Sequence, residues 1–141
     1  MRWPFPLPVP FSDVDHTGIV FFARVFGYCH LAFEEWYFQS LHETFDKAFV
    51  AHGYGTPVVR TEASYVSPMR HGDRFSIHVH AEQVGLRSFT LGYRLFGMNA
   101  GGEDIRHLSD VRITHAAVNL REFGSMELPD ALRKALGGAI G

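Results

Sequence analysis

The chain has 141 residues, 46% of them hydrophobic, so we expect a single domain over residues 1–141 with a sizeable core. A formal net charge of −2 argues against a broad basic surface, and therefore against a general nucleic-acid-binding protein. Cys29 is the only cysteine, which excludes an intrachain disulfide and a multi-cysteine metal site and fits a reducing, cytoplasmic setting.

The N-terminal segment WPFPLPVPF (3–11) alternates apolar residues with prolines. A period of two puts the five apolar side chains on one face, and the four prolines remove every N–H donor from one edge. We therefore predict an edge strand that pairs on one side only; the alternative is a polyproline arm on the surface. The segment lacks the apolar run of a secretory signal, and no stretch of the chain is apolar enough to span a membrane, so we expect no membrane partner.

A long helix is predicted over residues 23–40, followed by a shorter helical piece over 41–51 that ends at Gly53. The apolar stripe of the long helix recurs at three- and four-residue steps and comprises Val25, Phe26, Cys29, Ala32, Phe33, Trp36 and Tyr37.

After Gly55 the apolar period changes to two, which predicts strands. Their ranges are 56–66, 74–84, 87–97 and 105–120, and the short links between them suit an antiparallel meander. A C-terminal helix lies within 128–138, with Pro129 at its start and Gly137 past its end. The order of elements indicates an α+β fold in two layers.

Two long stretches of this sequence resemble the 4-hydroxybenzoyl-CoA thioesterase family. DVDHTGIVFFARVFGYCHLAFEEWY (13–37) is similar to its D-x-D-x-x-G-[IV]-V-[FYW] signature and the helix that follows, and GTPVVRTEASYVSPMRHGDRFSIHVHAEQVGLRSF (55–89) is similar to its second and third strands. SDVRITHAAVN (109–119) resembles its last strand. The resemblance implies a hot-dog fold, in which an antiparallel five-stranded sheet wraps around one long helix. It also implies hydrolysis of an acyl-CoA, with an aromatic, 4-hydroxybenzoyl-like acyl group favoured, to free acid and CoA, without a metal or another cofactor.

The resemblance implies a catalytic carboxylate at Asp15, as nucleophile or as general base on water; the residues leave both open. It implies that the backbone N–H of Phe22, at the helix start, holds the thioester carbonyl, where unpaired donors and the helix dipole favour negative charge. Gly18 lets the chain turn sharply and lets substrate approach the backbone. Helix capping by Asp13 and Asp15 is the alternative. The signature favours catalysis for Asp15 and leaves Asp13 as a turn or strand-end acid.

The family also builds each active site between the subunits of a dimer, or of a tetramer made from two dimers. By resemblance, Thr56 lines the site from across that interface. The position of Phe22 carries Tyr or His in many family members, so a side-chain hydrogen bond is not expected there. GLRS (85–88) stands where one branch has a basic run, and only Arg87 remains. We assign Arg87 and Ser88 to substrate binding, with Arg60, Arg70 and Arg74 as weaker candidates for CoA phosphates.

The histidines have simpler interpretations. His78 and His80 share a strand face, which suits a metal pair, but no third ligand is evident and a polar surface is the simpler interpretation. His30 and Glu34 have the spacing of a surface pair, although another thioesterase branch places a catalytic Glu on this helix. His16 is interpreted as a loop residue that can tune Asp15. Three more are expected to be structural or exposed: His52, His107 and His115.

Two other functions stay open at this point. Hydration or dehydration of an enoyl thioester uses the same fold, but it needs a His–acid pair over the acyl chain. A non-catalytic acyl-CoA sensor would bind the ester without releasing thiol. Fold alone does not decide among them.

Overall fold

The computed structural model describes residues 1–140, apart from the side chains of residues 49 and 138–140. Its elements, in chain order, are β1 (Arg2–Pro4), the short 3-10 helix η1 (Phe11–Asp13), α1 (Phe22–Leu41), α2 (Phe45–His52), β2 (Tyr54–Gly55), β3 (Val58–Tyr65), β4 (Phe75–Val84), β5 (Ser88–Met98), β6 (Asp104–Ala116), β7 (Val118–Asn119) and α3 (Asp130–Ile140).

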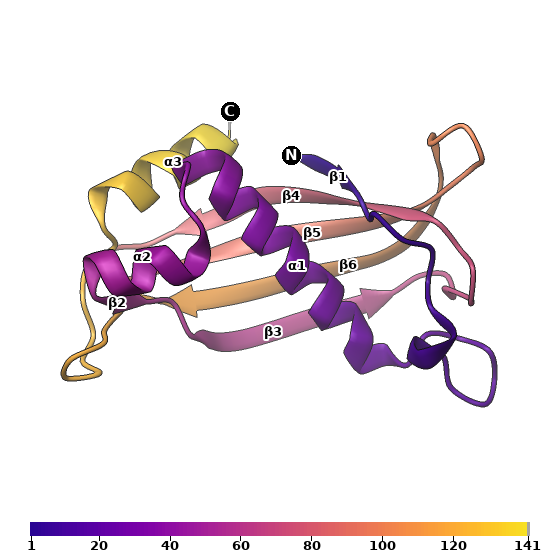
Figure 1. The fold of residues 1–141 in the computed structure, drawn as a ribbon, viewed down its shortest axis with the longest axis horizontal. Helices are drawn as coiled ribbons and strands as arrows, with labels where there is room; N and C mark the ends of the chain where they lie inside the picture. The colour runs from indigo at the N-terminus through magenta and orange to yellow at the C-terminus, as the bar shows by residue number, and fades with distance from the viewer. Residues whose placement is uncertain (141) are drawn as a thin grey trace.

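Five antiparallel strands form one sheet in the order β1-β4-β5-β6-β3, and α1 lies across one face of it (Figure 1). β2 and β7 pair separately as a two-stranded sheet. The predicted two-layer α+β architecture, a five-stranded antiparallel sheet with one long helix, is therefore confirmed.

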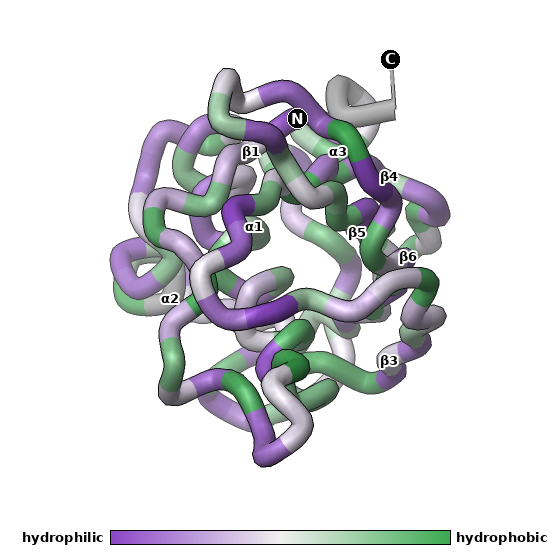
Figure 2. The backbone as a smooth tube through the Cα atoms, turned by 90° about the vertical axis from the view of Figure 1, so that its right-hand side faces the viewer, coloured by the Kyte–Doolittle hydropathy of each residue, from purple (hydrophilic) through white to green (hydrophobic). Residues whose placement is uncertain are grey.

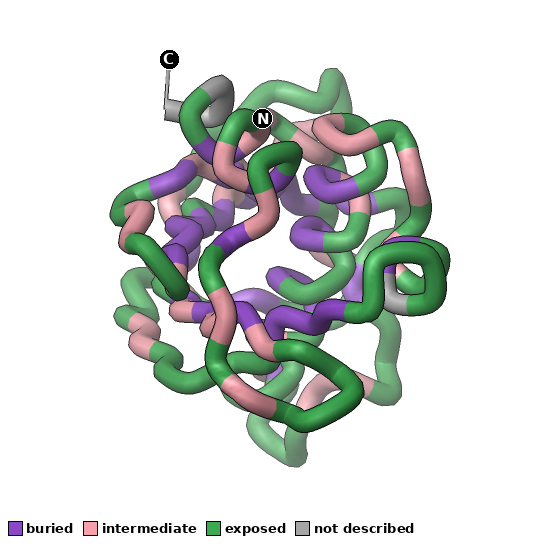
Figure 3. Tube along the Cα trace, turned by 90° about the vertical axis from the view of Figure 1, so that its left-hand side faces the viewer, coloured by how far each residue is buried: buried purple, intermediate pink, exposed green. Residues whose placement is uncertain are grey.

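The apolar stripe explains why α1 lies on the sheet. Seven of its side chains are buried: Val25, Tyr28, Cys29, Ala32, Phe33, Trp36 and Tyr37. Six of these were predicted; Phe26 is only half-buried and Tyr28 takes its place in the buried set. Each large apolar side chain buried in this way contributes about 1.5–3 kcal/mol relative to exposure. The buried positions run through the interior and the exposed ones through the outer loops (Figure 3).

The central strands alternate between the two faces of the sheet. Ile77, Leu91 and Leu95 are fully buried, whereas Arg94 and Arg112, on the other face, are exposed. Figure 2 shows hydrophobic and hydrophilic stretches along the same chain. The period-two pattern thus places the core between α1 and the sheet and leaves the opposite face polar.

The predicted meander is wrong for β3. This strand pairs with β6 at the far edge of the sheet, and β4 and β5 pair as a hairpin, as do β5 and β6. The link over 66–74 is too long for a tight hairpin. It instead contacts the turn before α1, where Met69 O accepts a hydrogen bond from Val20 N over 2.8 Å. Within the described residues β3 has no strand on its outer side, so it is a free edge.

The N-terminal strand is shorter than predicted. β1 ends at Pro4 and pairs with β4 only, so the one-sided edge strand is confirmed for three residues. Beyond it Phe5 N and Val9 N still donate to Phe75 O and Asp73 O, each over 2.9 Å. Leu7 and Phe11 are exposed, however, so the five apolar side chains do not share one face. Proline fixes φ near the polyproline value, which prevents a continuous ladder.

The remaining helices differ from prediction at their ends. α2 begins at Phe45, four residues later than predicted. α3 continues through Gly137 to Ile140 instead of ending before the glycine, because Gly137 keeps negative φ and a helix tolerates one glycine at a cost of about 1 kcal/mol. β2 and β7 are two residues each, too short to produce a recognisable pattern.

Candidate active site

The turn before α1 is a closed loop of seven residues. Val14 pairs with Val20, Asp15 N donates to Ile19 O over 2.9 Å, and Gly18 N donates to Asp15 O over 3.0 Å. Gly18 has a φ of +82°, a conformation that other residues adopt at a cost. Its predicted role in a sharp turn is therefore the one that the backbone requires.

Asp15 presents an exposed carboxylate in this turn. Its Oδ1 accepts hydrogen bonds from the Thr17 backbone N–H, over 2.8 Å, and from the Thr17 hydroxyl. These two bonds, the hydroxyl one first, lower the pKa of Asp15, so the group is ionised at neutral pH. An ionised, exposed carboxylate can attack a carbonyl or accept a proton from water.

The start of α1 carries free donors. Phe21 is the N-cap residue, and no side chain caps the helix, so capping by Asp13 or Asp15 is wrong. Within the described residues the N–H groups of Phe22 and Ala23 have no hydrogen-bond acceptor. The predicted backbone donor at Phe22 is therefore free to bind a developing oxyanion, with the helix dipole favouring negative charge there.

Asp13 fastens the loop to the helix. Its carbonyl accepts the Phe21 N–H over 2.8 Å, and its Oδ2 accepts the Tyr28 hydroxyl over 2.5 Å. Arg24 Nε lies 3.7 Å from its Oδ1. Burial and the Asp13 bond raise the pKa of Tyr28 well above its usual range, which keeps this phenol a donor. Asp13 is thus more than the turn acid that the sequence indicated.

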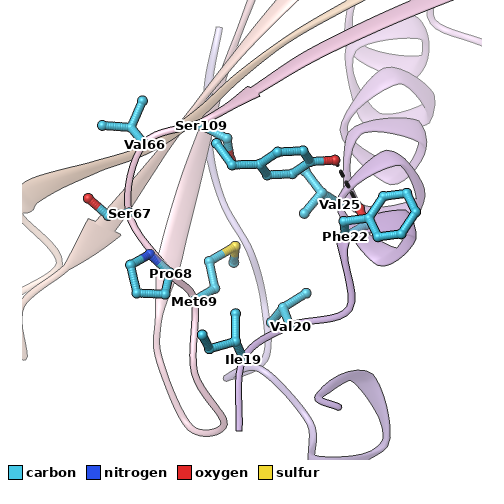
Figure 4. Close-up of a pocket in the computed structure, with 10 residues that line it drawn as sticks. Ile19, Val20, Phe22, Val25, Val66, Ser67, Pro68, Met69 and Ser109 are labelled. Atoms are coloured by element: carbon cyan, nitrogen blue, oxygen red, sulfur yellow. Dashed lines mark hydrogen bonds between the residues drawn. The ribbon is translucent and has the colours of Figure 1, made fainter. Parts of the chain in front are cut away.

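A cavity of about 320 Å³ opens beside the helix start (Figure 4). Most of its lining is apolar: Ile19, Val20, Phe22, Val25, Val66, Pro68 and Met69. Three hydroxyl groups join them, those of Tyr65, Ser67 and Ser109. The Tyr65 hydroxyl donates to the Phe22 carbonyl over 3.3 Å. No local sequence pattern indicated these three residues, because β3, the 66–74 link and β6 are brought to the helix start only by the fold.

Thr56, Arg87 and Ser88 lie at the opposite end of the sheet. Ser88 pairs with Ala116, whose N–H donates to Pro57 O over 3.0 Å, next to Thr56. The Arg87 carbonyl accepts the Ala117 N–H over 2.9 Å. The eight residues of β3 separate this end from the Asp15 turn, a length of about 26 Å. Within one chain the six predicted site residues therefore form two separate groups of three, one at the Asp15 turn and one at the opposite end of the sheet.

Thr56 is held by His115, one of the histidines expected to be structural or exposed. His115 is 2% exposed, stacks between Phe33 and Phe89, and its Nδ1 lies 2.8 Å from the Thr56 carbonyl. Burial lowers the pKa of His115, so the ring is neutral and donates from Nδ1. The Thr56 hydroxyl is buried and has no partner within the described residues.

The charged residues predicted elsewhere mostly pair with each other. His78 and His80 contact Asp104 at 2.7 Å and Glu82 at 3.1 Å, and the described residues contain no group of three or more side chains arranged for a metal ion. The predicted surface pair of His30 and Glu34 is confirmed, at 3.3 Å.

The four candidate arginines lie at two ends of the sheet, with Arg60 and Arg87 near the end of β6 and Arg70 and Arg74 on the link before β4. Arg60 pairs with Glu62 on the polar face of the sheet, and Arg70 contacts Asp73 through its backbone N–H and carbonyl. The Arg87 guanidinium has no ion-pair partner among the residues described.

None of the helices described is both long and apolar enough to cross a membrane.

Comparison with known proteins identifies the family. Residues 9–136 match the Thioesterase-like superfamily. A 1,4-dihydroxy-2-naphthoyl-CoA hydrolase of Nostoc punctiforme is 32% identical over 135 residues, covering 94% of this chain and 84% of that protein.

Solved structures agree in fold. The 1,4-dihydroxy-2-naphthoyl-CoA thioesterase of Synechocystis has a TM-score of 0.82 at 21% identity, covering 97% of this chain and 96% of the other. The 4-hydroxybenzoyl-CoA thioesterase of Pseudomonas sp. strain CBS-3 has a TM-score of 0.84 at 20% identity, covering 96% and 97%. The chain thus belongs to the Thioesterase-like superfamily and is a thioester hydrolase with the hot-dog fold.

Proposed function

We propose that this enzyme hydrolyses a hydroxylated aromatic acyl-CoA to the free acid and CoA. The observation that carries the proposal is the ionised Asp15 carboxylate, held in a turn that leads directly to an uncapped helix start and an apolar cavity. The relatives support the acyl class: the Nostoc protein is named for 1,4-dihydroxy-2-naphthoyl-CoA, so a bicyclic ring joins the 4-hydroxybenzoyl group as a candidate.

In the proposed reaction the thioester carbonyl oxygen binds the Phe22 N–H, and the acyl group enters the cavity. As general base, Asp15 takes a proton from water while the water oxygen bonds to the carbonyl carbon. The resulting oxyanion is stabilised at the helix start, then collapses, and the C–S bond breaks to release CoA thiolate, which takes up a proton. As nucleophile, an Asp15 oxygen instead bonds to the carbonyl carbon and the C–S bond breaks, which releases CoA thiolate and leaves a mixed anhydride. Water then hydrolyses the anhydride to the free acid and the Asp15 carboxylate. CoA is part of the substrate, and no other cofactor enters the proposal.

We also propose that the active unit is a homodimer formed through the β3 edge. Every residue in the first half of β3 is exposed, including the apolar Val58 and Val59, at 49% and 61%. An unpaired, exposed strand edge is a ready site for pairing with a second copy. Antiparallel pairing of two β3 strands would place Thr56, Arg87 and Ser88 of one subunit near Asp15 of the other. A tetramer built from two such dimers remains an expectation of the family resemblance.

Thiol release from a panel of acyl-CoA esters tests the function. The panel contains 1,4-dihydroxy-2-naphthoyl, 4-hydroxybenzoyl, benzoyl, phenylacetyl and straight-chain esters from acetyl to palmitoyl. We expect release with the hydroxyaroyl esters, and a loss of about 10²–10⁴-fold in Asp15→Asn with the fold retained by circular dichroism. Tight binding without thiol release would instead indicate a sensor, and loss of crotonyl-CoA absorbance without free thiol would indicate a hydratase.

A further inference from the structure

Ser109 is a polar residue in an apolar part of the sheet. It is 2% exposed and lies on β6 between Leu95 of β5 and Tyr65 of β3. The next inward-facing residues of β6, Val111 and Ile113, are apolar and buried. Core packing gives no reason for a serine here, and its hydroxyl, which is not one of the enclosed side-chain atoms without a partner, opens to the cavity.

The Ser109 hydroxyl has no hydrogen bond from any residue that the structure describes, and it lines the cavity at the helix start (Figure 4). A serine hydroxyl is one donor and up to two acceptors. The two other hydroxyls of the cavity differ. Tyr65 is already bonded to the Phe22 carbonyl, and Ser67 is only half-buried, on the link after β3. Ser109 is therefore the hydroxyl that a buried ligand group would meet.

The Tyr65 side chain connects the helix start to the strand pair that contains Ser109. Its backbone pairs with Ser109, and its phenol reaches the carbonyl of Phe22, 3.3 Å away. One phenol ring thus spans the gap between β3 and α1. A hydroxybenzoyl group has the same ring and the same para oxygen. With its carbonyl at the Phe22 N–H, it can lie beside the Tyr65 ring and bring its far edge to the β6 side of the cavity.

We propose that Ser109 is a specificity-determining residue, whose hydroxyl binds a ring hydroxyl of the acyl group on the edge remote from the thioester. This inference rests on the proposed function, because it takes the cavity as the acyl site. Asp15 and the Phe22 N–H act on the thioester in any ester, whereas Ser109 distinguishes a hydroxylated ring from a plain one. A site that bonds a substrate hydroxyl discriminates against the analogue that lacks it, since the buried group is then left unpaired.

The test compares kcat/KM for 4-hydroxybenzoyl-CoA and benzoyl-CoA, and for 1,4-dihydroxy-2-naphthoyl-CoA and 2-naphthoyl-CoA, in wild type and Ser109→Ala. We expect wild type to prefer the hydroxylated ester of at least one pair, and Ser109→Ala to reduce that preference by about three- to tenfold, the value of one neutral hydrogen bond. Ser64→Ala, the same change at an exposed serine on the polar face of β3, should reduce it less than about twofold. Ser109→Cys replaces the hydroxyl with a slightly larger thiol, which is a weak donor and acceptor, and should behave like the alanine variant.

The outcomes separate the two proposals. If wild type hydrolyses the esters and both Ser109 variants keep the wild-type preference for the hydroxylated ester, Ser109 does not bind the ring hydroxyl. The thioesterase assignment then still stands. An equal fall for both members of each pair would also overturn the inference, because it indicates a packing role. If wild type hydrolyses no aroyl-CoA, the proposed function itself fails and the role of Ser109 falls with it.

Discussion

At the scale of single residues, the proposed role of the Asp15 carboxylate predicts how the rate depends on pH. Its pKa is lowered by the hydrogen bonds from Thr17, so the ionised form persists as pH falls to the usual range of a carboxyl group and below it. A base or nucleophile acts in its ionised form, so activity is present above this lowered pKa and is lost as pH falls through it. We expect kcat/KM to stay constant as pH falls from 7 to about 5, and to decrease only at lower pH.

Thr17→Val checks this cause. The variant removes the hydroxyl bond to Asp15 but keeps the backbone one, so the acid limb of kcat/KM should move to higher pH. Thiol release measured between about pH 2.5 and 7, with the fold monitored by circular dichroism at each pH, provides the comparison. An acid limb that stays in place would show that Asp15 is not the group that titrates.

The residues of the site differ in how far the sequence could predict them. Asp15, Gly18 and Phe22 lie within eight consecutive positions, so one contiguous signature indicates all three. Tyr65 and Ser109 reach the same cavity from β3 and β6, and their neighbours along the chain carry no sign of it. A cavity formed by long-range strand pairing leaves no local pattern, and only the folded chain reveals its lining.

At the scale of elements, α1 could be predicted from a local pattern, whereas the order of strands in the sheet could not. The helix could be placed within one residue at each end because its buried stripe repeats every three to four positions. The pairing of β3 with β6 could not be predicted, because an apolar period of two identifies a strand but not the strand beside it. The N-terminal segment is a third case, because both the strand and the polyproline interpretation hold in part. Residues 2–4 pair as a strand, and the next five follow the edge of β4 without forming one.

The attachment of α1 to the Asp15 turn is a prediction at this scale. The Tyr28 hydroxyl holds Asp13, and the Asp13 carbonyl holds Phe21, directly before the Phe22 donor. Tyr28→Phe removes one hydrogen bond to a charged group, so we expect the free energy of unfolding to fall by about 1–3 kcal/mol. Because the donor loses its fixed position, kcat should fall by about three- to tenfold while KM changes little.

Urea unfolding and steady-state kinetics measure the two effects of Tyr28→Phe. Tyr37→Phe is the matched control, since its hydroxyl pairs with that of Tyr54, away from the site. That control should lose stability without losing kcat. Equal losses of kcat in both variants would indicate that general destabilisation, rather than the position of the helix start, lowers the rate.

At the scale of the whole molecule, one ionic cluster ties the N-terminal strand to the rest of the sheet. Asp104, at the start of β6, accepts hydrogen bonds from Arg2 at 3.1 Å and from Ser76 at 2.6 Å, and His78 lies 2.7 Å away. Burial acts to raise the pKa of Asp104, but the bonds from Arg2, Ser76 and His78 outweigh it and hold the pKa at about 2. The cluster therefore spans β1, β4 and β6.

This cluster predicts an acid-dependent stability. A carboxyl group whose pKa is lower in the folded chain stabilises it above the unfolded value, near 3.8, and the contribution is lost as pH falls towards 2. We expect Asp104→Asn to lower the free energy of unfolding at pH 7 by about 1 kcal/mol, since solvent screens the partly exposed pairs. Glu103→Gln, an exposed neighbour without an ion pair among the described residues, is the control. Urea unfolding at pH 7 and pH 3 should show a smaller difference in Asp104→Asn than in wild type.

The separation of about 26 Å between the Asp15 turn and the end that carries Arg87 gives the sharpest prediction about the assembly. If each active site combines Asp15 of one subunit with Arg87 of the other, Asp15→Asn and Arg87→Glu lie in different subunits of any one site. A mixed dimer of the two variants then has one site with both changes and one site with neither. Random reassembly makes about half of the dimers mixed, so two nearly inactive proteins should together recover about a quarter of the wild-type rate.

The measurement is thiol release after the two variants are unfolded in urea, mixed in equal amounts and refolded, with each variant refolded alone as control. Subunit mass from light scattering establishes that the product is at least a dimer. A site contained within one protomer would give no recovery, because every chain would carry a defect in its own site. Recovery requires that the two ends of β3 meet across a subunit boundary, as antiparallel pairing of the free β3 edges would bring about.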